Sequence, residues 1–271
     1  MPAFDKLVME EGRLMRKIKL PTVDEYIHHL FVHGNDGQNF ALFSGLTFPT
    51  VLNYYQDTRV LVMLEHGFED ASFDMHTHFE YIVQDDFRDF TRSLQDQKSR
   101  LCLLDVEDEK RLVQLTPQEQ AELLYVAHKK ETFRSPFYHT LQNRFVYLAD
   151  ENERIAKLYF RDYKEMTRLI VFLFNQTATQ KTRGTMFFRR RTQQVVPELL
   201  HEQFLLFEEL LEDGALLSLA RMDDGSFRLE LREIADPSFP DEIMDEVETY
   251  LSQPTLGLLP FIARSKTEDG K

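Results

Sequence analysis

Residues 144–175 read RFVYLADENERIAKLYFRDYKEMTRLIVFLFN, and this stretch carries most of the evidence for the expected fold. Two runs rich in β-branched and aromatic residues, 145–148 and 155–160, flank a polar turn, which is typical of a β-hairpin. Asp162 precedes Glu165 by three residues, as in a capping box. Apolar residues then recur at helical spacing: Met166, Leu169, Ile170, Leu173 and Phe174. The stretch therefore predicts a hairpin followed by an amphipathic helix.

Three other stretches show the same order of two strand-like runs and a helix. They comprise 60–64 with 73–83 and a helix over 86–94; 101–104 with 112–115 and a helix from Thr116; and a hairpin about the turn 223–225 with a helix from Ser238. We expect an α+β fold in which antiparallel β-hairpins alternate with amphipathic helices as ββα units. One or two sheets would be covered by helices, and the acidic C-terminal third would be helical.

Residues 197–213 predict one further helix, which ends at Gly214. Its apolar residues occur nearly all round the helix: Leu199, Leu200, Phe204, Leu205, Leu206, Phe207, Leu210 and Leu211. A helix of this kind is either central in a core or covered by a partner.

Negative charge is concentrated near the C-terminus. The chain has a net charge of −14, and residues 198–248 contain sixteen acidic residues against three arginines, a net charge of −13. Residues 176–194 lack hydrophobic periodicity and separate this part from a nearly neutral one. We predict an α+β domain over 1–176, a basic loop or linker over 177–194 and an acidic subdomain over 195–271, which could pack together as one domain.

The single cysteine, Cys102, lies in an apolar run, so the chain has no intramolecular disulfide and suits a reducing compartment. The first twenty residues lack the apolar segment of a secretory signal. The longest strongly apolar run, 169–174, is far shorter than the roughly 18 residues that span a bilayer. We therefore expect a cytoplasmic protein with no membrane partner.

One stretch has the composition of a metal site. If residues 74–80 form a strand, Asp74, His76, His78 and Glu80 share one face, and two imidazoles with a carboxylate can bind a divalent metal. A metal-dependent enzyme would follow, with the metal as its only cofactor. The competing interpretation is an ordinary half-exposed strand, polar outside and apolar inside.

A basic stretch directly precedes the acidic part. Lys181, Arg183, Arg189, Arg190 and Arg191 occur in eleven residues without an acidic one. Arginine recognises phosphate and carboxylate groups, so these residues could bind an anion, a partner or RNA. They could equally pair with the acidic third of the chain.

The sequence contains no nucleophile elbow, Walker A loop or dinucleotide-binding motif, so no catalytic residue is assigned. The overall negative charge makes nucleic acid an unfavourable partner. We expect a non-enzymatic protein-interaction or regulatory protein that binds another protein or forms a homo-oligomer. The alternatives are a metal-dependent enzyme through His76 and His78, or a nucleic-acid-associated factor through Arg189, Arg190 and Arg191.

Overall fold

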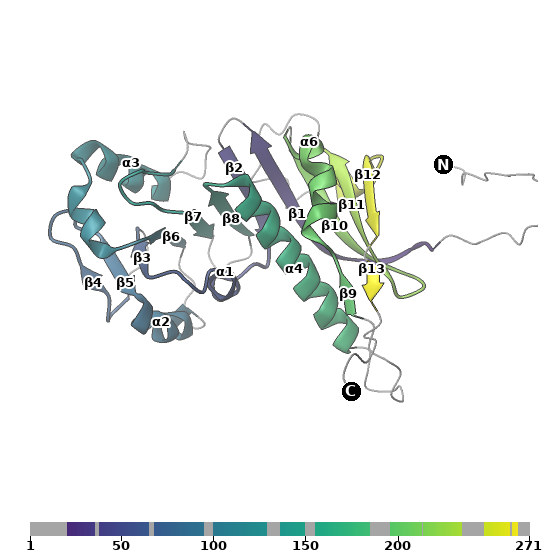
Figure 1. Ribbon diagram of the computed structural model, residues 1–271, viewed down its shortest axis with the longest axis horizontal. Helices are drawn as coiled ribbons and strands as arrows, with labels where there is room; N and C mark the ends of the chain where they lie inside the picture. The colour runs from purple at the N-terminus through teal and green to yellow at the C-terminus, as the bar shows by residue number, and fades with distance from the viewer. Residues whose placement is uncertain are drawn as a thin grey trace, which may run out of the picture.

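A computed structural model describes residues 21–35, 38–64, 68–94, 100–128, 136–149, 155–184, 196–212, 214–234, 247–260 and 262–264 (Figure 1). Eleven strands form one sheet in which every neighbouring pair is antiparallel. In sheet order they are β12 (Gly257–Pro260), β11 (Phe227–Glu233), β10 (Ala215–Met222), β1 (Val23–Asn35), β2 (Gln38–Ser44), β8 (Ile155–Phe160), β7 (Phe145–Ala149), β6 (Leu101–Val106), β3 (Val60–Met63), β5 (Glu80–Val83) and β4 (Ser72–Phe73). A separate pair joins β9 (Val196–Glu198) to β13 (Ile262–Arg264).

Strand β1 joins the C-terminal strands of the sheet to the N-terminal ones. It pairs with β10 on one side and with β2 on the other, so the C-terminal hairpin β10–β11 belongs to the same sheet as the N-terminal strands. Leu30 and Val32 point to one face and Phe31 to the opposite face, and all three are fully buried. The sheet is therefore covered on both faces at this strand.

Helices pack on both faces. One core contains apolar residues of α1 (Phe48–Tyr54), α2 (Phe87–Ser93), α4 (Tyr163–Gly184), α5 (His201–Phe204), the 3-10 helix η6 (Leu205–Phe207) and α6 (Glu208–Leu211). The other core contains residues of the 3-10 helix η3 (Glu109–Gln114), α3 (Pro117–His128) and α8 (Val247–Leu251). Figure 1 shows α4 crossing the sheet and α6 beside the end that carries β12. In the part of the chain that the structure describes, no helix is both long and apolar enough to cross a membrane.

The predicted arrangement of ββα units is wrong. All described strands except β9 and β13 form a single large sheet, and most of the helices are short insertions between the strands. Residues 112–115, expected as a strand, belong to η3 and the residue after it, and the described part of the C-terminal third contributes strands β10, β11 and β12 as well as helix. Antiparallel pairing between segments distant in sequence, rather than repeated local units, organises the fold.

Several local predictions are confirmed. The hairpin β7–β8 leads into α4, the hairpin β10–β11 turns at Asp223–Ser226, and α3 begins at a capping box in which Thr116 and Glu119 exchange hydrogen bonds. The domain boundary at 177–194 stays a prediction, because residues 185–195 lie outside the described part.

Candidate interaction surface

The sheet ends at strand β12, and the packing of this strand decides which of its side chains face outward. Gly257 lies against Phe207 of η6, where a Cβ at position 257 would be 2.8 Å from Cε1 of Phe207. Leu259 is buried in the same core as Phe207. Since side chains alternate along a strand, Leu258 points to the opposite face, where it is 54% exposed, and Leu256 is 49% exposed.

The segment that covers the other side of this strand also exposes leucines. Phe204, Phe207 and Leu211 face the sheet and are buried, whereas Leu206 is 75% and Leu210 is 39% exposed. Leu206 and Leu210 are four residues apart and therefore lie on one side of the helical segment. We call these four residues, Leu206, Leu210, Leu256 and Leu258, the edge leucines.

The sequence signalled only half of this surface. The predicted helix over 197–213 correctly indicated an excess of apolar residues, but the structure divides it into α5, η6 and α6 after the short strand β9. Leu256 and Leu258 were not predicted. Their alternation with Thr255 and Gly257 after Pro254 is the pattern that could have indicated a strand with one apolar face.

Glutamates surround the leucines of the α5–α6 segment. Glu202, Glu208, Glu209 and Glu212 are all exposed, and none of the four forms an ion pair with another described residue. Residues 196–212 contain no lysine or arginine. The α5–α6 side of the edge leucines is therefore apolar, with negative charges beside it.

The opposite face of the sheet carries a polar network next to β12. The Tyr26 hydroxyl donates to Oε2 of Glu230 at 2.8 Å, and Nη2 of Arg232 donates to the Tyr26 hydroxyl at 3.0 Å. Glu230 also forms ion pairs with Arg228 and Arg232. These contacts join β1 to β11 across β10. The four side chains bind one another, so we assign the network a structural role.

His29 lies beside this network, with Nδ1 2.9 Å from the Ser218 hydroxyl oxygen. Burial disfavours the charged imidazole and lowers the pKa of His29 to about 4. Burial likewise lowers the pKa of His28 to about 4 on the other face, where its ring contacts Phe174. Both imidazoles are therefore neutral at pH 7.

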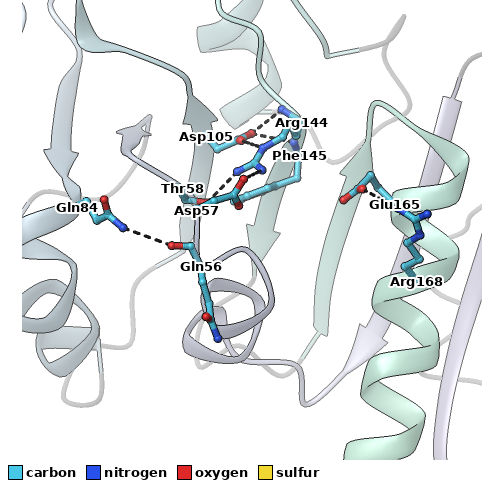
Figure 2. Close-up of polar contacts among 9 residues, drawn as sticks. All are labelled: Gln56, Asp57, Thr58, Gln84, Asp105, Arg144, Phe145, Glu165 and Arg168. Atoms are coloured by element: carbon cyan, nitrogen blue, oxygen red, sulfur yellow. Dashed lines mark hydrogen bonds and ion pairs between the residues drawn. The ribbon is translucent and has the colours of Figure 1, made fainter.

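Figure 2 shows a second polar cluster, near the other end of the sheet. Asp105 of β6 accepts hydrogen bonds from the backbone amides of Arg144 and Phe145, at 2.7 and 2.9 Å, and from Nε of Arg144 at 2.8 Å. Arg144 also donates to Asp57 at 2.7 Å and to the Thr58 hydroxyl at 3.2 Å. Burial raises the pKa of Asp105, and these hydrogen bonds oppose that effect. The cluster fixes the start of β7 to β6 and to the loop before β3.

The residues proposed to bind a metal occupy a turn rather than a strand. Residues 74–79 connect β4 to β5, and Oδ1 of Asp74 accepts hydrogen bonds from the backbone amides of His76 and Thr77. His76 lies 3.2 Å from the Leu115 carbonyl oxygen, and His78 has a φ of +61° with its ring edge-on to Phe73.

The strand expected here is therefore wrong, because this hydrogen bonding closes the chain into a turn. Glu80, the fourth proposed ligand, begins β5. No group of three His, Cys, Asp or Glu side chains in the described ranges could hold a metal ion. Metal binding by Asp74, His76, His78 and Glu80 stays a prediction.

The proposed basic site falls mostly outside the described residues. Lys181 and Arg183 are in the last turns of α4, and Arg189, Arg190 and Arg191 lie outside the described ranges. Binding of an anion or a partner by these five residues, and their pairing with the acidic third, stay predictions.

No protein-family model, no curated protein and no solved structure matches this chain. Its class is therefore defined by its own features: a large antiparallel sheet with helices on both faces and leucines exposed beside its terminal strand.

Proposed function

We propose that this chain is a non-enzymatic, cytoplasmic protein-interaction protein that binds a partner protein through the edge leucines. The observation that carries the proposal is that all four are exposed on or beside β12, an end strand of the sheet. Leu258 projects from one face of β12, and Leu206 and Leu210 belong to the segment that packs on the other face. Leu206 and Leu210 project together from this segment, and large apolar side chains exposed side by side are typical of a protein-binding surface.

The free energy that the edge leucines can contribute limits the strength of the complex. Complete burial of one leucine side chain contributes about 1.5–3 kcal/mol, and each edge leucine is now between 39% and 75% exposed. Covering all four would offset part of the association cost, which is of the order of 4–15 kcal/mol. We therefore expect a transient partner rather than a permanent subunit.

A selection from a random peptide library tests this function without knowledge of the partner. The library is passed over the wild-type protein and, in parallel, over the fourfold variant L206Q/L210Q/L256Q/L258Q. Peptides that bind only the wild-type protein support the proposal. Equal recovery on both proteins, or no selective binders at all, contradicts it.

A matched control is available on α3, where Leu124 is 43% exposed away from β12. Leu124→Gln should retain the selected peptides. Light scattering of the wild-type protein and the fourfold variant shows whether the partner is a second copy of the chain. In that case the wild-type protein dimerises and the variant does not.

A further inference from the structure

We infer that the partner segment that covers Leu206 and Leu210 is a basic, amphipathic helix. The inference rests on the proposed function and adds the chemistry of the ligand. It concerns only the α5–α6 side of the edge leucines.

The shape of this surface favours a helix. Leu206 and Leu210 form an apolar stripe one turn long, and the residues that anchor the segment, Phe204, Phe207 and Leu211, are buried beneath it. An apolar pair spaced by four residues on one helical segment packs well against leucines with the same spacing on another.

The negative charge around the stripe favours a partner with positive charge. Glu202 precedes Leu206 by four residues and Glu209 follows it by three, so both carboxylates lie beside the stripe. Glu208 and Glu212 lie toward α4, where their charges help to raise the pKa of Tyr163 above its ordinary value, although burial is the larger cause. All four belong to a stretch of eleven residues without a cation.

No described residue neutralises these carboxylates. Like charges at this spacing repel one another, so an approaching lysine or arginine gains attraction and relieves repulsion together. An acidic helix would meet repulsion from the same groups, and a neutral helix would gain only from the leucines. A basic helix with an apolar stripe satisfies both parts of the surface.

The test uses three labelled helical peptides with one leucine pattern, in which the polar positions are all lysine, all glutamine or all glutamate. Binding is followed by fluorescence anisotropy. We expect the lysine peptide to bind at least about fivefold more tightly than the glutamine peptide, and the glutamate peptide to bind least. The preference for lysine should decrease between about 50 and 200 mM salt.

Two variants assign the binding to this surface. E202Q/E209Q should weaken the lysine peptide by about fivefold and leave the glutamine peptide unchanged. L206Q/L210Q should weaken both peptides. The matched control E69Q/D70N removes two exposed charges near β4, at the other end of the sheet, and should have no effect. Thermal unfolding of each variant shows that it is folded.

The outcomes separate the two proposals. Equal binding of the lysine and glutamine peptides overturns the basic partner, while the library selection can still support an interaction protein. Loss of lysine-peptide binding in E69Q/D70N also overturns it, because the attraction would then be nonspecific. If the library selection itself yields no peptide that depends on the edge leucines, the proposed function fails as well.

Discussion

Phe207 and Gly257 are in such close contact that a methyl group at position 257 would lie 2.8 Å from Cε1 of Phe207. The contact fixes η6 against β12 and so holds Leu206 and Leu258 on the two sides of the strand. We predict that Gly257→Ala lowers the free energy of unfolding by about 1–3 kcal/mol, because Phe207 or the strand must shift. Chemical denaturation measures the change. In the F207A background, Gly257→Ala should no longer lower the free energy of unfolding. If the effects of the two substitutions simply add in the double variant G257A/F207A, the prediction is wrong.

Asp105→Asn should be destabilising. The Asp105 carboxylate is buried and compensates the positive charge of Arg144. It accepts two hydrogen bonds from Arg144 and one from the backbone amide of Phe145 (Figure 2). The substitution weakens three hydrogen bonds and part of the charge compensation of Arg144, at an expected cost of about 1–3 kcal/mol. Asp57→Asn provides the matched control, because the Asp57 side chain is 75% exposed and pairs with the same guanidinium. Its expected cost is below about 1 kcal/mol. Equal costs in a denaturation experiment would refute this difference.

Glu230→Gln should destabilise the β12 end of the sheet. Glu230 pairs with Arg228 and Arg232 and accepts from Tyr26, while Nε and Nη1 of Arg232 are already buried without a hydrogen-bond partner. Removing the negative charge leaves Arg232 uncompensated, at an expected cost of about 3–5 kcal/mol. Glu233→Gln, on the exposed end of the same strand, should change the free energy of unfolding by less than about 0.5 kcal/mol. A small effect at Glu230 would show that the network is not needed for stability.

Stability should fall as the solution becomes acidic. Burial lowers the folded-state pKa of His28 and of His29 to about 4, below the value near 6.5 of an unfolded chain. Between these two pH values the unfolded state therefore binds more protons than the folded state. The contribution of the two histidines to the free energy of unfolding is complete above about pH 6.5 and is lost as the pH falls toward 4.

The variant His28→Phe tests this pH dependence. The His28 ring contacts Phe174, so an aromatic replacement keeps the apolar contact and removes the titrating group. Between about pH 7 and pH 4.5 the free energy of unfolding should decrease in both proteins. The decrease should be smaller in H28F than in the wild-type protein, by about 1–3 kcal/mol. Identical pH profiles for H28F and the wild-type protein would rule out a contribution from His28.

The sequence predicted the edge leucines only in part. The apolar excess of residues 197–213 was visible in the sequence, but the exposure of Leu206 and the burial of Phe207 were not. Both side chains are large and apolar, and the position of β12 determines which one is buried and which one is exposed. Leu258 and Leu259 differ in the same way, because the strand has one face against Phe207 and one face outward.

The sequence by itself determined those elements whose residues interact with near neighbours. The hairpin β7–β8 with α4 and the hairpin β10–β11 follow from alternation, turn residues and helical spacing, all of which are local. Tertiary structure decided the rest. Strand β1 was not predicted, since its polar residues obscure the alternation and irregularities interrupt its register with β10. Its pairing with β10, nearly two hundred residues away, is a long-range interaction, and it joins both halves of the chain into one sheet.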